Sequence, residues 1–167
     1  MLSQPAGIDR FDARLRAPFA TLGICADDKH VTGITFLPAT ESAKMPKPNT
    51  IAHLACVQLS AYLDDPRFEF DLPVRLAGSM HQIRVWNAMR KIPAGKTQTY
   101  GELAAAIGSS ARAVGGACGA NPVPIVVPCH RVVAANGLGG FMGGTGDDTL
   151  GIKRWLLAHE QRPFELK

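Results

Sequence analysis

Hydrophobic and polar positions in the first part of the chain follow the spacing of strands and of one helix. Apolar or alternating runs at Thr21–Cys25 and Val31–Leu37, joined by a polar turn, predict a β-hairpin. Asn49 precedes apolar positions that share one face of a helix, so we expect it to cap a helix there. The alternation at Phe68–Leu72 predicts a further strand, and Pro73–Gly78 marks a linker.

After the linker, apolar positions recur every three to four residues, which is typical of helices. Ser79 with Gln82, and Thr99 with Glu102, have the spacing of a capping box, in which two side chains satisfy free backbone N–H groups at the start of a helix. We expect helices from about Ser79 to a stop at Pro93, at Tyr100–Ile107, at Ala111–Cys118 with Ser109 or Ser110 as its cap, and at roughly Leu150–His159.

These elements predict two domains. Residues 1–77 would form an α/β domain with a small antiparallel sheet and a helix. Residues 78–167 would form a mainly α-helical domain, in which the two helices joined by a tight Gly-Ser turn are a helix-turn-helix candidate. The total of 167 residues suits two small domains or one large one.

The composition indicates a protein of the cytoplasm. No apolar run reaches about 18 residues, so we expect no membrane-spanning helix, and the N-terminus lacks the apolar segment of a signal peptide. The four cysteines form no C-x-x-C pair and should be free thiols in a reducing compartment. Three of them, Cys25, Cys56 and Cys118, are interpreted as small buried hydrophobic residues.

The net charge of +4 is unevenly distributed. Residues 1–74 hold seven Lys or Arg and nine Asp or Glu, a balance of −2, whereas residues 75–131 hold seven Lys or Arg and one acid, a balance of +6. A concentrated basic segment is typical of a nucleic-acid-binding half. A solvated face with scattered arginines would explain the same count, so charge alone does not decide.

A proline-rich stretch surrounds Cys129. Three prolines between positions 122 and 128 stiffen the backbone, so the position of the thiol is fixed by rigid chain. His130 and Arg131 follow directly, and cationic neighbours favour the thiolate, which is the nucleophilic form. Since a free thiol with a pKa near ~8.5 is only a few per cent ionised at neutral pH, a nucleophilic role needs such activation.

Several motifs in the second half resemble the O6-alkylguanine-DNA alkyltransferases. The most specific is Pro128-Cys129-His130-Arg131-Val132-Val133, preceded by Asn121-Pro122-Val123-Pro124 and by Ala111-Arg112-Ala113-Val114-Gly115-Gly116-Ala117. Thr99–Ala104 and Trp155–Glu160 also resemble segments of this family. The close match covers about Ser79 to Glu160, whereas the N-terminal half fits only in its α/β pattern.

The resemblance implies repair of DNA by irreversible, stoichiometric transfer of an alkyl group to Cys129, without a cofactor. The alkyl donor would be O6-alkylguanine, or O4-alkylthymine, in double-stranded DNA. His130 would act as a base through a water and Glu160 would orient His130, in the usual order of nucleophile, base and orienting group. Asn121 would brace the active-site turn, and Tyr100 would donate a proton or hydrogen bond to the departing guanine. The thioether product would limit each molecule to one reaction.

The DNA contacts implied by the resemblance lie mainly on the second helix of the helix-turn-helix. Arg112 would enter the duplex in place of the flipped nucleotide, and small residues would let the helix approach the minor groove closely. The expected DNA-contact residues are Ser110, Ala111, Arg112, Ala113, Gly115, Gly116 and Arg131, and the expected pocket residues are Pro124, Val132, Met142 and Gly143. We expect a monomer, with cooperative binding on DNA left open.

Met142 and Gly143 are among the positions that depart from the family pattern. Met142 stands where many members carry Tyr, and Gly143 stands where Ser is frequent, so the range of accepted alkyl groups stays open. Cys25 and His30 resemble part of a zinc site found in some eukaryotic members. A structural zinc needs about four ligands, and the others are lacking, so we expect no metal.

Two other functions are alternatives. A non-enzymatic protein of the same fold would bind alkylated DNA without accepting the alkyl group, but such relatives lack the cysteine that is present here at position 129. A Cys–His hydrolase would need an oxyanion hole and would release its product.

Overall fold

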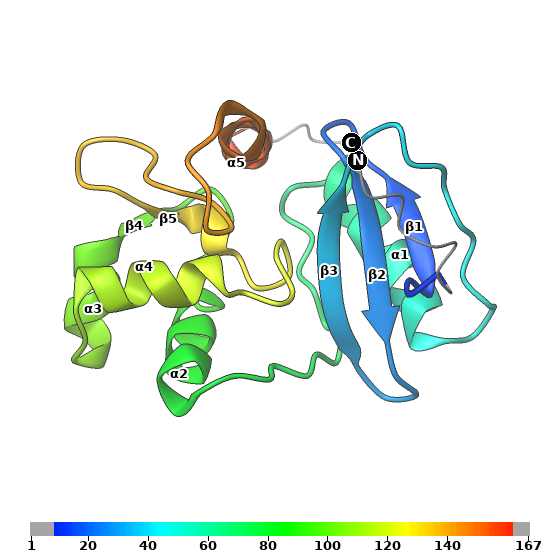
Figure 1. The fold of residues 1–167 in the computed structure, drawn as a ribbon, viewed down its shortest axis with the longest axis horizontal. Coiled ribbons are helices and arrows are strands. Elements are labelled where there is room, and N and C mark those ends of the chain that lie inside the picture. The colour runs from blue at the N-terminus through cyan, green and yellow to red at the C-terminus, as the bar shows by residue number, and fades with distance from the viewer. Residues whose placement is uncertain (1–8, 162–167) are drawn as a thin grey trace, which may run out of the picture.

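The first part of the chain forms a three-stranded antiparallel sheet covered by one helix. The computed structural model describes residues 9–161. Strands β1 (Ala13–Arg16), β2 (Thr21–Ala26) and β3 (Val31–Leu37) lie in the order β1-β2-β3. Helix α1 (Ile51–Asp64) packs against one face of this sheet, as Figure 1 shows on the right. The buried residues of the sheet and of α1 belong to one hydrophobic core.

Two predictions of secondary structure for this part are wrong. Phe68–Leu72 forms no strand, because the backbone N–H of Asp71 is bound by the Gln58 side chain at 3.0 Å rather than by a neighbouring strand. The cap of α1 is Thr50, whose hydroxyl accepts the backbone N–H of His53, and Asn49 lies outside the helix with φ 61°. The hairpin of β2 and β3 is confirmed, whereas β1 was not anticipated.

The second part is mainly helical, and its first three helices begin where capping residues predict. Both capping boxes are present, at the starts of α2 (Met80–Met89) and α3 (Tyr100–Ile107). Ser110 caps α4 (Ala111–Gly119). A short 3-10 helix, η1 (Cys129–Arg131), leads to β5 (Val132–Val133), which pairs in parallel with β4 (Gln98–Thr99). This small pair was not anticipated.

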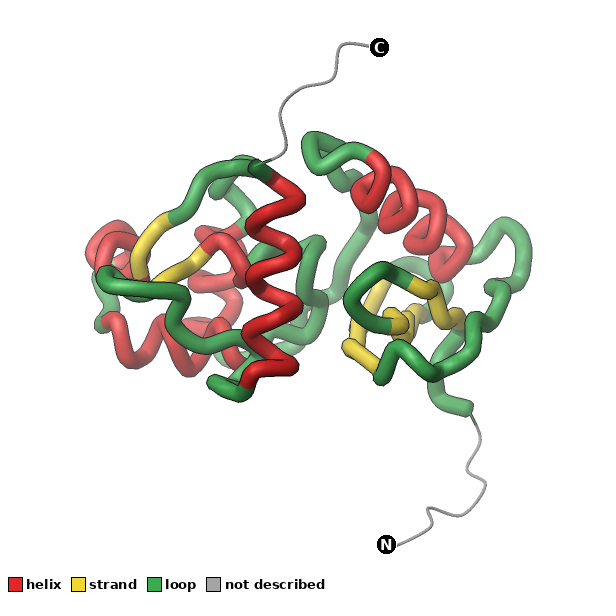
Figure 2. Tube along the Cα trace, turned by 90° about the horizontal axis from the view of Figure 1, so that it is seen from above, coloured by secondary structure: helices red, strands yellow, loops and turns green. Residues whose placement is uncertain are grey.

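The last helix, α5 (Asp147–Glu160), begins three residues before the expected start at Leu150, with Asp147 and Asp148 in its first turn. Acidic side chains there interact favourably with the positive end of the helix dipole. In Figures 1 and 2, α5 runs between the sheet and the other helices of the second part. None of the helices in residues 9–161 combines the length and the apolar character needed to cross a membrane.

The sheet and the helical part pack directly against each other. Phe36 of β3 lies against Phe141, with ring centroids 5.6 Å apart, and Phe19 lies against Trp155 of α5 at 4.7 Å. The backbone N–H of Ile34 donates to the carbonyl of Pro122 at 3.0 Å. Between α1 and α2 the chain has no helix or strand apart from a single bridge of Val74 to Val31. A domain boundary at 77/78 stays a prediction, and the outer ends of both expected domains lie outside the described residues.

Candidate active site

Cys129 begins η1, directly after a tightly braced turn. The side chain of Asn121 donates to the carbonyl of Val127 at 2.7 Å and accepts the backbone N–H of Val123 at 3.0 Å, so both ends of its amide hold the turn. Ile125 within the turn has φ 74°, which is an unfavourable conformation for a β-branched residue. Such strain persists only where the surroundings enforce it, and it is frequent near functional sites. The bonds expected of Asn121 are therefore present.

The thiol of Cys129 lies at a small cavity. The cavity has a volume of about 180 Å³ and Cys129 is only 3% exposed. Its Sγ lies 3.8 Å from the Sδ of Met142. Besides Cys129 itself, three segments line the cavity. They are α3 and α4, and a glycine-rich loop between β5 and α5. The lining residues are Tyr100 of α3, Gly115, Cys118 and Gly119 of α4, and Gly140, Phe141, Met142 and Gly143 of the loop.

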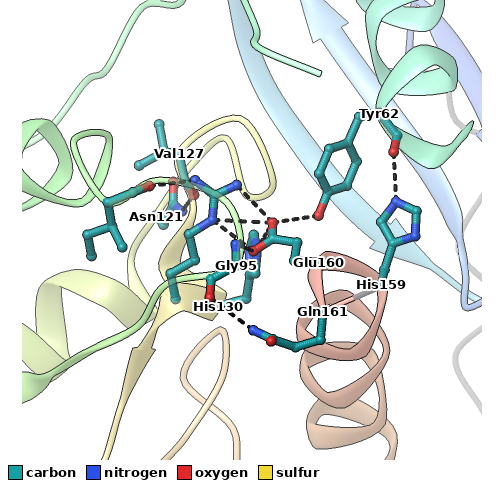
Figure 3. A network of polar contacts seen from close by, with 10 residues as sticks. Tyr62, Gly95, Asn121, Val127, His130, His159, Glu160 and Gln161 are labelled. Carbon is teal, nitrogen blue, oxygen red and sulfur yellow. Dashed lines mark hydrogen bonds and ion pairs between the residues drawn. The ribbon is translucent and has the colours of Figure 1, made fainter. Parts of the chain in front are cut away.

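A buried carboxylate binds the residues that follow the thiol. Glu160, at the end of α5, accepts a hydrogen bond from Nε2 of His130 at 2.8 Å (Figure 3). It also accepts from the guanidinium of Arg131, whose Nη2 lies 2.8 Å from Oε1. The hydroxyl of Tyr62, on α1, also donates to Oε1 at 2.8 Å. The side chains of His130 and Glu160 are 0% and 1% exposed. The carboxylate therefore joins η1, α5 and α1 in the interior.

The charges in this network follow from burial and from its hydrogen bonds. Burial lowers the pKa of His130 more than Glu160 raises it, so the imidazole is neutral. Burial alone would raise the pKa of Glu160, but hydrogen bonds from His130 and Arg131 outweigh it and hold that pKa far below its usual range. A neutral imidazole that donates from Nε2 carries its lone pair on Nδ1. This Nδ1 is buried and has no hydrogen-bond partner in residues 9–161, so it is free to accept a proton.

The thiol itself is not ionised in this state. Burial raises the pKa of Cys129 to about 11, although Asn121 and Lys153 act in the opposite direction. The expectation that His130 and Arg131 favour the thiolate as cations is wrong, because His130 is neutral and Arg131 is turned toward Glu160. A nucleophilic role of this thiol would therefore require a base that removes its proton.

Arg131 also requires a correction as an expected DNA contact. Its Nη1 donates to the carbonyl of Ile92 at 2.6 Å, its other nitrogens bind Glu160, and its side chain is 12% exposed. Of the other basic residues in the +6 segment, Arg75 pairs with Asp27, and Arg84 donates to the carbonyl of Ile107. Part of the segment's charge therefore makes contacts within the protein.

Tyr100 forms part of the cavity wall. Its hydroxyl donates to the carbonyl of Gly140 at 3.3 Å, and burial raises its pKa to about 12, so the phenol keeps its proton. A Cβ at Gly139 would lie 2.7 Å from the Tyr100 ring, and Gly139 has φ 72°. Glycine is needed there both for the backbone conformation and for space.

Lys153 is a residue of the site that sequence reasoning missed. It is fully buried on α5, and its Nζ donates to the carbonyls of Val132, Leu138 and Gly140 at 2.7, 2.6 and 2.8 Å. Burial lowers the pKa of Lys153 to about 8. Its position three residues before Leu156, on the apolar face of the helix, was an available signal, because lysine is almost never fully buried without partners. Tyr62 was also missed, and it lies outside the motifs of the second half.

The remaining expected residues divide between the cavity, the interior and the surface. Met142 and Gly143 line the cavity, whereas Pro124 and Val132 are buried and do not line it. The exposed positions on α4 are Ala111, Arg112, Ala113 and Gly116, next to the capping Ser110. A Cβ at Gly115 or Gly116 would meet no atom within 4 Å, so the fold does not itself require glycine there.

The candidate zinc residues have other contacts. Cys25 Sγ donates to the carbonyl of Arg10 at 3.4 Å, and the His30 ring contacts Asp27 and Arg75. In the part of the chain that the structure describes, no three His, Cys, Asp or Glu side chains are placed to share a metal ion.

Comparisons with known proteins show the family of this chain. Residues 80–162 match the family described as 6-O-methylguanine DNA methyltransferase, DNA binding domain. A methylated-DNA–protein-cysteine methyltransferase from Methanosarcina acetivorans is 36% identical over 155 residues, which cover 89% of this chain and 96% of that protein. This chain belongs to that family.

Two further relatives support the assignment. A family member from Mycolicibacterium paratuberculosis is 50% identical over 111 residues, and this match spans 65% of the chain and 64% of that relative's own length. A crystal structure of Mycobacterium tuberculosis OGT in complex with DNA superposes with a TM-score of 0.74 at 38% identity, covering 89% of this chain and 91% of that one. The antiparallel sheet followed by a helical part is thus the arrangement of solved members of the family.

Proposed function

We propose that this family member repairs alkylated DNA by moving the alkyl group from the O6 oxygen of guanine, and from O4 of thymine, to Cys129. The observation that carries the proposal is the buried thiol at a cavity, followed in the chain by an imidazole whose Nε2 is held by an ionised carboxylate. The names of the relatives agree with this reaction. A protein that only binds lesions would not need this arrangement.

The geometry suggests how the thiol is activated. The free lone pair on His130 Nδ1 takes the proton of Cys129 through a water, and the resulting imidazolium is stabilised by Glu160 at 2.8 Å. The thiolate then forms a carbon–sulfur bond as the carbon–O6 bond breaks. Tyr100, which is protonated at neutral pH, donates to the guanine as it leaves with the bonding electrons. The product is a thioether, which ends the reaction after one turnover.

The position of α4 suggests how DNA reaches the thiol. One part of this helix lines the cavity through Gly115 and Gly119, and its start exposes Arg112. A duplex whose minor groove lies on α4 would therefore be next to the cavity when a nucleotide flips out. The helices α3 and α4 then act as a helix-turn-helix, and the missing side chains at Gly115 and Gly116 leave room for DNA. We further propose that the protein binds as a monomer in the cytoplasm.

Peptide mass analysis after incubation with a duplex containing O6-methylguanine tests the reaction. Alkyl transfer predicts one methyl group on the Cys129 peptide, and no more than one transfer per molecule. Cys129→Ala should abolish transfer and keep DNA binding, while Cys56→Ala, on α1 outside the site, should react like the wild type. Tight binding without an adduct would favour a lesion-binding protein, and repeated turnover would favour a hydrolase.

A second measurement tests the role of Arg112. Arg112→Ala should slow transfer from duplex DNA more than transfer from the free base O6-methylguanine, because only the duplex requires a flipped nucleotide to be replaced. Equal losses on both substrates would contradict that role.

A further inference from the structure

Four sulfur atoms lie in or just behind the wall of the cavity, and alkyl transfer uses only one of them. Cys118, on α4, lines the cavity together with Cys129 and Met142. The Sγ of Cys129 lies 3.8 Å from the Sδ of Met142, and the Sγ of Cys118 donates to the Sδ of Met89 at 3.5 Å. The reaction proposed above gives Cys118 no role. The cavity therefore has more soft donor atoms than that reaction needs.

These sulfurs suit a soft metal ion. Thiolates and thioethers are the ligands that Cu(I) prefers, whereas magnesium and calcium bind through oxygen. With metal–sulfur bonds of ~2.3 Å, as for zinc, one ion can contact two sulfurs that lie up to ~4.6 Å apart. The 3.8 Å between Cys129 Sγ and Met142 Sδ is within this limit. Because Cu(I) is stably bound by about two or three sulfurs, it does not require the four ligands of a structural zinc.

The charges near the cavity favour a monovalent ion. Burial and the negative charge of an ionised Cys129 raise the pKa of Cys118 to about 12, so two thiolates would repel each other here. A cation bound to both removes this repulsion. The buried ammonium of Lys153 acts to lower the pKa of both thiols, so it already supplies one positive charge. With Cu(I), the two thiolates and Lys153 leave no net charge, whereas a divalent ion would leave a buried positive charge, which is costly.

We propose that the cavity is also a binding site for a soft monovalent metal ion, Cu(I), held by the sulfurs of Cys118, Cys129 and Met142. Binding forms two metal–thiolate bonds and releases both thiol protons to water. No electron is transferred, because the metal arrives and remains as Cu(I). The Met142 sulfur coordinates through a lone pair, and Cys118 gives up its contact with Met89. The bound ion withholds the Cys129 sulfur from any alkylating agent.

Titration of the full chain with Cu(I) alone, added without oxygen as its acetonitrile complex, tests the site. One ion should bind per molecule and remain bound in competition with the chromogenic chelator bathocuproine disulfonate. Two protons should be released per ion at pH 7, because burial raises the pKa of Cys118 to about 12 and that of Cys129 to about 11. Iodoacetamide at pH ~9 should label the Cys129 peptide of the metal-free protein and not that of the loaded protein.

Three variants locate the ion. Cys118→Ala should lower the affinity for Cu(I) by at least 10–100-fold and release one proton fewer, because even the outer-shell partners of a metal contribute roughly that much. Met142→Leu removes a sulfur at nearly constant volume and should lower the affinity about tenfold. Cys56→Ala removes a thiol on α1, outside the cavity, and is the matched control that should bind like the wild type.

The metal site is refuted if the wild type loses all Cu(I) to the chelator, or if Cys118→Ala binds Cu(I) with unchanged affinity. Should Cys118→Ala fail to fold, Met142→Leu decides by the same criterion. Displacement of Cu(I) by an equal concentration of Zn(II) would refute the preference for a monovalent ion. Methyl transfer is measured on the metal-free protein, so its absence would refute the proposed function and leave the metal site standing.

Discussion

Removal of one buried hydroxyl should measure how strongly α1 is tied to the carboxylate of Glu160. Tyr62 is fully buried, and its hydroxyl lies 2.8 Å from Glu160 Oε1. Tyr62→Phe removes this donor and no other atom. Because a hydrogen bond to a charged group contributes about 1.5–3 kcal/mol, the free energy of unfolding should fall by that amount. For a chain of this length, the melting temperature should fall by roughly 3–12 °C.

The assay is urea unfolding followed by tryptophan fluorescence, since Trp86 is fully buried and Trp155 packs against Phe19. Tyr100→Phe is the matched control, because it removes the same atom from the other of the two tyrosines. That hydroxyl makes a longer bond of 3.3 Å to a neutral carbonyl, so we expect a loss below about 1 kcal/mol but slower alkyl transfer. A Tyr62→Phe protein with the wild-type urea midpoint would refute the described bond.

Three further changes test the charged groups of the site. Lys153→Met leaves three carbonyls without their donor and should destabilise the protein by about 3 kcal/mol or more, measured by thermal melting; an unchanged melting temperature would contradict this. Because burial raises the pKa of Cys129 to about 11, only ~0.01% of this thiol is ionised at pH 7. Alkylation of Cys129 by iodoacetamide should therefore accelerate about tenfold per pH unit up to pH 10. A rate that reaches a plateau near pH 8 would contradict the raised pKa. The pKa of Glu160 is held below its ordinary value of ~4.3, so the ionised carboxylate stabilises the folded protein fully above that pH and less as the pH falls. The urea midpoint of Glu160→Gln should therefore depend less on pH between 7 and 3 than that of the wild type.

The starts of α2, α3 and α4 were the part of the fold best predicted from sequence. The capping boxes at Ser79 and Thr99 and the cap at Ser110 depend on residues three positions apart, so a local pattern contains the information needed. The error at Phe68–Leu72 has the opposite origin. Its alternation is real, but Gln58, from an earlier helix, supplies the partner that a neighbouring strand would have supplied.

In the candidate site too, the residues of a local motif could be predicted from sequence and the contacts of distant residues could not. Cys129, His130 and Asn121 lie within one motif, and the structure brings them together around one turn. The donors to Glu160 and the donor to the loop carbonyls could not be inferred locally, because Tyr62 is 98 residues from Glu160 and Lys153 contacts three separate carbonyls. The state of the thiol also depends on burial, which a cationic-looking Cys-His-Arg sequence does not reveal.

The contact between the sheet and the helical part has a consequence for any attempt to divide the chain. A fragment beginning at residue 78 would lack Phe36 and Phe19, which cover Phe141 of the cavity wall and Trp155 of α5. These rings would then face water as a new apolar surface, which promotes aggregation. The carbonyl of Pro122, just before the braced turn, would also lose the N–H of Ile34. The half of the chain that contains Cys129 therefore depends on the sheet as a scaffold, although the sheet supplies no residue that lines the cavity at the thiol.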